Sequence, residues 1–105
     1  MEIPASVRCI EADAFCHCQN LKRVTFAEGS RLEKIGVSCF SDSWIEEIQL
    51  PRTLKEIGIF VFGACYNLKT IYVEDGCEAS LVDSDIPAST RVVSLCTTLT
   101  GGISI

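Results

Sequence analysis

The chain has 105 residues, a length typical of one domain, and 48% of its residues are apolar, which is enough for a hydrophobic core. Fourteen Asp and Glu residues against nine Lys and Arg residues give a net charge of -5, which argues against nucleic acid or an anionic membrane as the partner, because both are bound by basic surfaces. The sequence also lacks the run of about 18 apolar residues of a membrane span and the basic and apolar regions of a signal peptide, so neither is predicted.

A repeat with a period in the low twenties organises most of the chain. Residues 50–73, LPRTLKEIGIFVFGACYNLKTIYV, define it, and the copy that begins at Ile3 matches it closely. The copy between them is looser, because it has two extra residues in Glu28 to Arg31 and lacks one residue between Phe40 and Ile45. This period, with a Leu-x-x-Ile-x-Leu core, is the signature of leucine-rich repeats. The sequence therefore predicts a single domain of stacked coils, at about residues 3–25, 26–49 and 50–73.

Each coil is predicted to contain two short extended segments joined by turns. The first segments lie at residues 7–10, 32–35 and 54–57, and the second segments at residues 21–26, 45–50 and 68–73. In the first of the longer segments, Val24-Thr25-Phe26 shows the period-two alternation of a strand, which places Val24 and Phe26 in the core and Thr25 outside. Such short strands are stable only when a neighbouring coil covers their apolar side chains.

A phenylalanine recurs between the two extended segments of every coil, at Phe15, Phe40 and Phe62. The residues that precede them, Ala14, Cys39 and Val61, are small and apolar. We interpret the three rings as a ladder that stacks through the core after a tight turn, with room for one helical turn, rather than as the wall of a ligand pocket.

The repeat weakens after Val73. Residues 74–85 are predicted to form a turn and an acidic spacer, and residues 86–93, IPASTRVV, echo the start of the first coil, IPASVRCI at residues 3–10. This alignment places Val92-Val93 in the first extended segment of a fourth, degenerate coil and leaves the rest of residues 86–105 as a partial coil and tail. Repeat arrays need capped ends, so we expect either a section of a longer array or a unit that self-associates through its open ends.

Seven cysteines suggest disulfides or a metal site, but the repeat argues against both. Cys18 and Cys65 occupy equivalent places two coils apart, roughly 10 Å at ~4.8 Å per coil, which is too far for a disulfide. We expect Cys18, Cys39 and Cys65 to pack as buried, small apolar side chains and Cys9 to point outward. The run Cys16-His17-Cys18 lacks the ligand spacing of a zinc site. No metal or other cofactor is predicted, and a thiol-based redox or metal-binding role is a minor alternative.

Signals of catalysis are weak in this sequence. The single histidine, His17, has no carboxylate or Asn residue at a motif distance, so a Cys-His nucleophile pair would arise only by coincidence of fold. The sequence contains neither a Gly-rich phosphate loop nor a nucleophile elbow. We therefore expect a protein that is not an enzyme.

The pattern Ile-Pro-x-Ser-Val-x-x-Ile-x-x-x-Ala-Phe-x-x-Cys-x-x-Leu-x-x-Val resembles the BspA-like leucine-rich repeats of bacterial and protist surface proteins. It covers residues 3–77 well and residues 86–95 weakly, and it departs from the family where Ser43 replaces Cys and Glu11 replaces Gly. The resemblance implies a repeat solenoid, a right-handed β/α superhelix of about three and a half coils, with mostly short parallel strands, turns and few helical residues. It also implies binding or adhesion, often as a surface antigen, without catalytic residues.

The outward positions of the longer segments are the candidate binding surface, because leucine-rich repeats normally bind partners on this sheet face. Stacking in register would bring these positions together in columns, and one aromatic residue would lie at the edge of the face. The candidate binding residues are Lys22, Arg23, Thr25, Trp44, Glu46, Glu47, Gln49, Lys69, Thr70 and Tyr72. Opposite charges alternate in the column Lys22, Glu46 and Lys69, so a simpler interpretation is that they pair between coils and set the register.

The sequence and the resemblance together predict a non-catalytic protein-interaction module whose partner is another protein. We expect it to be part of a cell-surface or secreted, adhesin-like repeat protein. An intracellular scaffold repeat protein is the alternative.

Overall fold

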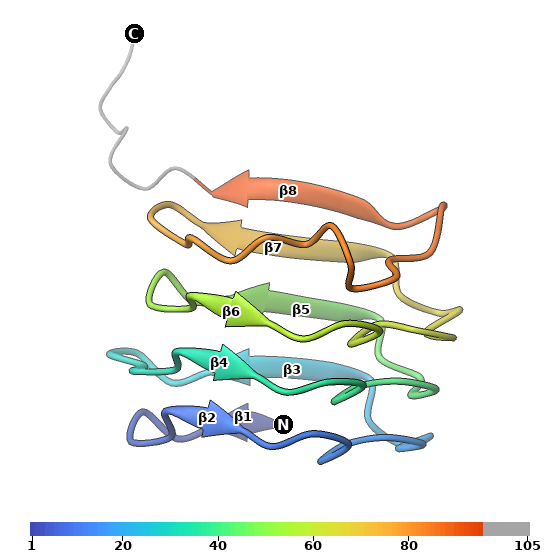
Figure 1. The fold of residues 1–105 in the computed structure, drawn as a ribbon, viewed down its shortest axis with the longest axis horizontal. Helices are drawn as coiled ribbons and strands as arrows, with labels where there is room; N and C mark the ends of the chain where they lie inside the picture. The colour runs from blue at the N-terminus through green and yellow to red at the C-terminus, as the bar shows by residue number, and fades with distance from the viewer. Residues whose placement is uncertain (96–105) are drawn as a thin grey trace, which may run out of the picture.

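The computed structural model describes residues 1–95, which form stacked coils of short parallel strands (Figure 1). The larger of two sheets has the strand order β1-β3-β5-β7-β8, and the smaller sheet has the order β2-β4-β6. The chain thus passes through the larger sheet five times and completes four turns of a solenoid. The strands are β1 (Glu2–Ile3), β2 (Cys9–Ile10), β3 (Arg23–Phe26), β4 (Lys34–Ile35), β5 (Glu47–Leu50), β6 (Glu56–Ile57), β7 (Thr70–Glu74) and β8 (Arg91–Leu95).

The two sheets form two sides of the solenoid, and they correspond to the two extended segments that the sequence predicts in each coil. Figure 1 shows the strands of the smaller sheet running opposite to those of the larger sheet, because each coil turns back between them. The stacking is in register: Val24 pairs with Ile48, and Ile48 pairs with Ile71. Equivalent side chains of successive coils therefore lie above one another, which is the columnar arrangement that the repeat predicts.

The turns that follow the smaller sheet contain no helix in residues 1–95, although the sequence analysis allowed a helical turn there. Around Phe15, the φ angles of Asp13 and His17 are 60° and 63°. Residues with positive φ interrupt a right-handed helix. Alternate N–H groups instead donate to the next coil, from Phe15 N to Cys39 O and from His17 N to Ser41 O, both at 2.9 Å.

The three predicted phenylalanines form a continuous stack in the core. The ring centroids of Phe15 and Phe40 are 5.5 Å apart and those of Phe40 and Phe62 are 6.2 Å apart, with 6° between the planes in both pairs. Phe40 and Phe62 are fully buried, whereas Phe15 is partly exposed. The ladder is confirmed, and its burial depends on a coil being present on both sides.

Two glycines mark the closest approach of successive coils. A Cβ atom at Gly58 would lie 2.6 Å from the backbone nitrogen of Val37, and one at Gly36 would lie 2.5 Å from that of Ala12. Both contacts are with the preceding coil. The first coil has Glu11 at the equivalent place, and its side chain is exposed.

The length differences of the second coil are confined to its corners. Seven residues separate β3 from β4, whereas five separate β1 from β2 and β5 from β6. These are the two extra residues that the sequence alignment placed in Glu28 to Arg31. Both sheets keep their register across them, so the additional chain lengthens only the loop at this corner.

The sequence alignment of the last coil is wrong in one respect. It placed Val92-Val93 in the smaller sheet, but β8 pairs with β7 in the larger sheet, with Val93 opposite Tyr72. The shared IPAS motif encodes a turn, in which Thr90 N donates to Pro87 O at 3.0 Å just as Val7 N donates to Pro4 O at 3.2 Å. Such turns precede strands of both sheets, so the motif does not determine which sheet follows. Residues 96–105, the predicted tail, lie outside the described part.

Burial of the cysteines follows their position in the stack. Cys39 and Cys65, in the second and third coils, are buried as predicted, and desolvation raises the pKa of Cys39 to about 12. Cys65 Sγ donates to the Phe40 carbonyl oxygen at 2.9 Å and lies 3.7 Å from Ser43 Oγ. Ser43 thus occupies the repeat's cysteine position in the second coil.

Cys18 and Cys9 belong to the first coil, which is covered on one side only. Cys18 is partly exposed, where the sequence predicted burial, and Cys9 is exposed as predicted. All six cysteines of the described residues are free thiols, and Cys96 lies outside them.

Candidate binding surface

The outward face of the larger sheet carries most of the predicted binding residues in columns. Arg23, Glu47 and Thr70 lie opposite one another on successive strands, and Gln49 lies opposite Tyr72. They alternate along each strand with buried apolar residues that face the core. The fold therefore presents a polar, partly charged surface whose side chains are not needed to fill the core.

Among the described residues, one ion pair joins strands across this face. Arg23 Nη2 lies 3.4 Å from Glu47 Oε1, and both side chains are more than a third exposed. Within residues 1–95, no ion pair joins Lys22, Glu46 and Lys69, although their signs alternate. An exposed ion pair contributes roughly 0.2 to 1 kcal/mol, so this pair adds little to the free energy that holds the coils in register.

A shallow hollow of about 220 Å³ lies on the face itself. Its rim includes five of the predicted binding residues, which are Arg23, Thr25, Glu47, Gln49 and Tyr72. Val24 of β3 and Ile48 of β5 complete its lining. This hollow offers a partner one aromatic ring, one ion pair and two uncharged polar side chains within a small area.

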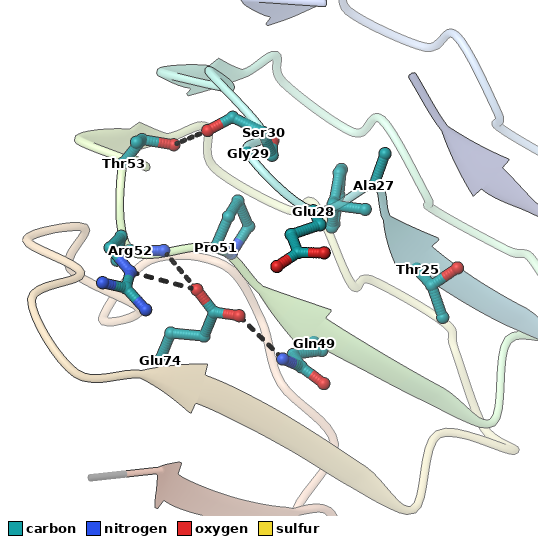
Figure 2. Close-up of a pocket in the computed structure, with 11 residues that line it drawn as sticks. Thr25, Ala27, Glu28, Gly29, Ser30, Gln49, Pro51, Arg52, Thr53 and Glu74 are labelled. Atoms are coloured by element: carbon teal, nitrogen blue, oxygen red, sulfur yellow. Dashed lines mark hydrogen bonds and ion pairs between the residues drawn. The ribbon is translucent and has the colours of Figure 1, made fainter. Parts of the chain in front are cut away.

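A larger hollow of about 560 Å³ lies beside the first, at the carboxyl ends of β3, β5 and β7 (Figure 2). Thr25 and Gln49 belong to both hollows. The other lining residues come from the strand ends and the loops that follow them, and they are Phe26, Ala27, Glu28, Gly29, Ser30, Pro51, Arg52, Thr53 and Glu74. The polar sheet face thus continues around the corner of the solenoid.

The Glu74 carboxylate fixes one wall of the larger hollow. Its Oε2 accepts a hydrogen bond from Gln49 Nε2 at 2.8 Å, and its Oε1 accepts one from the Arg52 backbone N–H at 3.0 Å. Arg52 Nε lies 3.7 Å from the same Oε1 atom. Figure 2 shows these contacts joining the end of β7 to β5 and the turn after it. The charge of Arg52 is therefore matched by that of Glu74.

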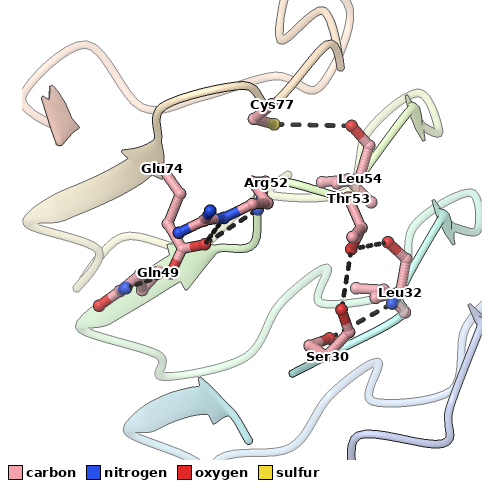
Figure 3. Close-up of polar contacts among 8 residues, drawn as sticks. All are labelled: Ser30, Leu32, Gln49, Arg52, Thr53, Leu54, Glu74 and Cys77. Carbon is pink, nitrogen blue, oxygen red and sulfur yellow. Dashed lines mark hydrogen bonds and ion pairs between the residues drawn. The ribbon is translucent and has the colours of Figure 1, made fainter. Parts of the chain in front are cut away.

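A second group of hydrogen bonds holds the lengthened loop of the second coil (Figure 3). Thr53 Oγ1 donates to the Leu32 carbonyl at 2.6 Å and lies 3.4 Å from the Ser30 carbonyl oxygen. The Leu32 N–H donates to Ser30 Oγ at 3.3 Å. These bonds tie the loop 27–33 to the turn of the next coil, so the hollow has a defined shape on both sides.

The remaining predicted residues do not line either hollow. Lys22, Glu46 and Lys69 directly precede strands of the larger sheet, and Thr70 is the first residue of β7. Trp44 lies in the shortened turn before β5 with 48% of its surface exposed, between two buried neighbours.

Sequence analysis missed Glu28, Arg52 and Glu74 in the larger hollow. Glu74 lies 25 residues after Gln49, so no local pattern links the two residues that share a hydrogen bond. The signal that was available is the two-residue insertion at Glu28 to Arg31, because a loop of unusual length at the ends of parallel strands changes the surface there.

The structure places a carboxylate beside His17, which the sequence pattern did not reveal. His17 Nδ1 lies 2.7 Å from Asp42 Oδ2 of the next coil, and both side chains are largely exposed. Among the described residues, no three His, Cys, Asp or Glu side chains are grouped to hold a metal ion. Residues 1–95 also contain no helix with the length and apolar character needed to cross a membrane.

Comparisons with known proteins agree on the type of repeat. A family model described as BspA type leucine rich repeat region (6 copies) matches residues 1–84. The crystal structure of the pneumococcal vaccine antigen PcpA is similar, with a TM-score of 0.65 and 27% sequence identity over 89% of this chain. The chain spans 26% of that structure's length. A search of curated protein sequences found no significant match.

Proposed function

Because the chain belongs to the family of BspA-type leucine-rich repeats, we propose that it is a non-catalytic module that binds a partner protein on the outward face of its larger sheet. The face supports this proposal because Tyr72, Gln49 and Glu47 surround a hollow without serving the core. Solenoids bind partners on extended surfaces of this kind, which each coil widens by one strand.

We infer further that the parent protein acts in adhesion at a cell surface or after secretion. The similar PcpA structure is described as a vaccine antigen, and family members of this type occur in surface proteins. The alternative is an intracellular scaffold, which one observation favours. All six described cysteines are free, and free thiols are more typical of reducing compartments.

The test compares two faces of the same molecule. The wild-type chain, a Tyr72→Ala/Glu47→Lys variant of the larger sheet and an Arg8→Glu/Lys55→Glu variant beside the smaller sheet would be immobilised. Extracellular and cytosolic protein fractions from the source organism would be passed over each, and retained proteins identified. Circular dichroism would first establish that both variants fold, as expected from their exposed or partly exposed positions.

We expect a partner from the extracellular fraction that binds the wild type and the smaller-sheet variant and is lost with the larger-sheet variant. Loss with the smaller-sheet variant alone would contradict the proposed face. A specific partner found only in the cytosolic fraction would favour the scaffold alternative and contradict the surface role.

A further inference from the structure

We propose that the larger hollow is a pocket for one basic side chain, lysine or arginine, of the partner protein. The inference rests on the proposed function, because it names the chemistry of a subsite beside the sheet face. It depends on the balance of charge in the hollow, the apolar character of its floor and the fixed geometry of its walls.

The charge balance of the hollow is negative. Its lining contains two carboxylates, Glu28 and Glu74, and one cation, Arg52. Glu74 and Arg52 satisfy each other through the backbone hydrogen bond and the 3.7 Å contact. Glu28 is exposed and takes part in no ion pair or side-chain hydrogen bond of the described chain. One uncompensated negative charge therefore remains, and a cation is its natural complement.

The position of Glu28 directs this charge into the hollow. Figure 2 shows its carboxylate between Ala27 and Pro51, on the side that faces Gln49 and Glu74. A basic side chain entering from the sheet face would meet Glu28 with its charged end. Glu74 is held by its bonds from Gln49 and Arg52, so this wall of the hollow would not have to move to admit the side chain.

The hollow also offers a surface for the aliphatic part of such a side chain. Pro51 is buried, and Phe26 and Ala27 are partly buried, so apolar atoms line the hollow between the polar groups. Lysine and arginine place their methylene groups on apolar surface while the charged end reaches a polar partner. A volume of about 560 Å³ leaves room for the backbone that carries the side chain.

The hollow depends on the lengthened loop of the second coil, which contributes Glu28 and Gly29 to its lining. The two extra residues between β3 and β4 bring Glu28 and Gly29 to the rim, and the bonds from Thr53 hold the loop in place. The corresponding loops after β1 and β5 have five residues and no counterpart of Glu28 in this position. A partner would therefore be positioned along the solenoid by one specific contact.

The test uses small probes of known charge on the full chain. Nα-acetyl-lysine methylamide, its arginine analogue and the isosteric norleucine analogue would be titrated into ¹⁵N-labelled protein, and amide chemical shifts followed. We expect shifts centred on Glu28, Gly29 and Arg52 with both basic probes, and weaker binding as salt increases. The norleucine probe should produce little change at these amides.

Charge variants sharpen the result. Glu28→Gln should weaken binding of the basic probes about two- to fivefold, the range for a partly exposed ion pair, and Glu28→Lys should weaken it further. Glu56→Gln, with the same change of charge on the smaller sheet, should have no effect. Equal binding of norleucine, equal loss with Glu56→Gln, or shifts away from the hollow would overturn the proposal.

Failure here and failure of the proposed function can be told apart. If the basic probes do not bind but Tyr72→Ala/Glu47→Lys still abolishes partner capture, the sheet face is correct and only the pocket chemistry is wrong. If the probes bind at Glu28 while partner capture is unaffected by the sheet variant, the pocket stands and the proposed face is wrong.

Discussion

The first coil and the two that follow it use the same residue types at equivalent places, yet they differ in burial. Phe15 and Cys18 are partly exposed, whereas Phe62 and Cys65 are completely buried. Glu11 occupies the place of a glycine that the later coils require. The difference teaches that core character in this fold comes from the neighbouring coil and not from the local sequence, as expected for a solenoid.

The largest test of this comparison is the phenylalanine ladder. Phe62→Ala should lower the free energy of unfolding by about 3 to 5 kcal/mol, because it removes a fully buried ring and leaves a cavity. Phe15→Ala should cost clearly less, since its ring is already partly in water. Urea unfolding followed by circular dichroism measures both. Equal losses at the two positions would show that burial in the stack is not what distinguishes the coils.

Thiol reactivity distinguishes the same coils without changing the sequence. The thiolate is the reactive form, and the raised pKa of Cys39, about 12, keeps it protonated at pH 8. We expect iodoacetamide to modify exposed Cys9 first. The rate of modification of Cys39 should be lower by a factor of about a hundred or more. Mass spectrometry of timed samples gives the rates. Rapid modification of Cys39 in the folded protein would contradict the predicted burial.

The raised pKa of the Cys39 thiol also predicts that the folded protein loses stability at alkaline pH. The unfolded chain releases the Cys39 proton near its ordinary pKa of 9.0, while the folded chain holds it to about 12. The contribution of protonated Cys39 to the free energy of unfolding is therefore complete below pH 9 and declines as the pH rises from 9 to 12. Urea midpoints measured from pH 8 to 11 should fall, and Cys39→Ala should reduce the slope of that fall. An unchanged slope would mean that other groups cause the decline.

The close approach of the coils gives a smaller effect. Gly58→Ala should destabilise the protein by about 1 to 3 kcal/mol, because the new methyl group meets the Val37 backbone, which cannot move aside as a side chain does. Glu11→Ala, at the equivalent place in the first coil, is the matched control and should change stability little. A tolerated Gly58→Ala would indicate that the coils are less tightly stacked than the structure shows.

The smallest expected effect is a gain. Phe60 has a φ of 57°, while the first two coils have Asp13 and Ser38 at this place, with φ angles of 60° and 55°. A bulky residue in this conformation is strained, whereas Asn adopts it readily. Phe60→Asn should therefore raise stability by about 0.5 to 1 kcal/mol, visible as a higher melting temperature. A lower melting temperature would show that the half-exposed ring makes contacts that outweigh the strain.

Most of the fold was predictable because one physical signal repeats. The apolar period located β2 to β7 but not β1, and the recurrence of Phe15, Phe40 and Phe62 located the ladder. The position of β8 was not predictable from its sequence, since the same Pro-initiated turn precedes strands of both sheets.

The candidate site was predictable only where it follows the repeat. The outward columns on β3, β5 and β7 come directly from the register. The larger hollow depends instead on the conformation of the loop 27–33 and on the contact of Glu74 with Gln49, which no periodic pattern encodes. Irregular loops and side-chain contacts between coils need the three-dimensional structure.

The lengthened loop after β3 has a consequence for engineering. Its two extra residues leave the register of both sheets unchanged, so this corner accepts a change of length that a strand would not tolerate, because a slip of one residue there would turn core side chains toward water. Loops grafted between Phe26 and Lys34 should therefore diversify the recognition properties of one coil while the scaffold stays constant. The corner is a place where new specificity can be selected independently of folding.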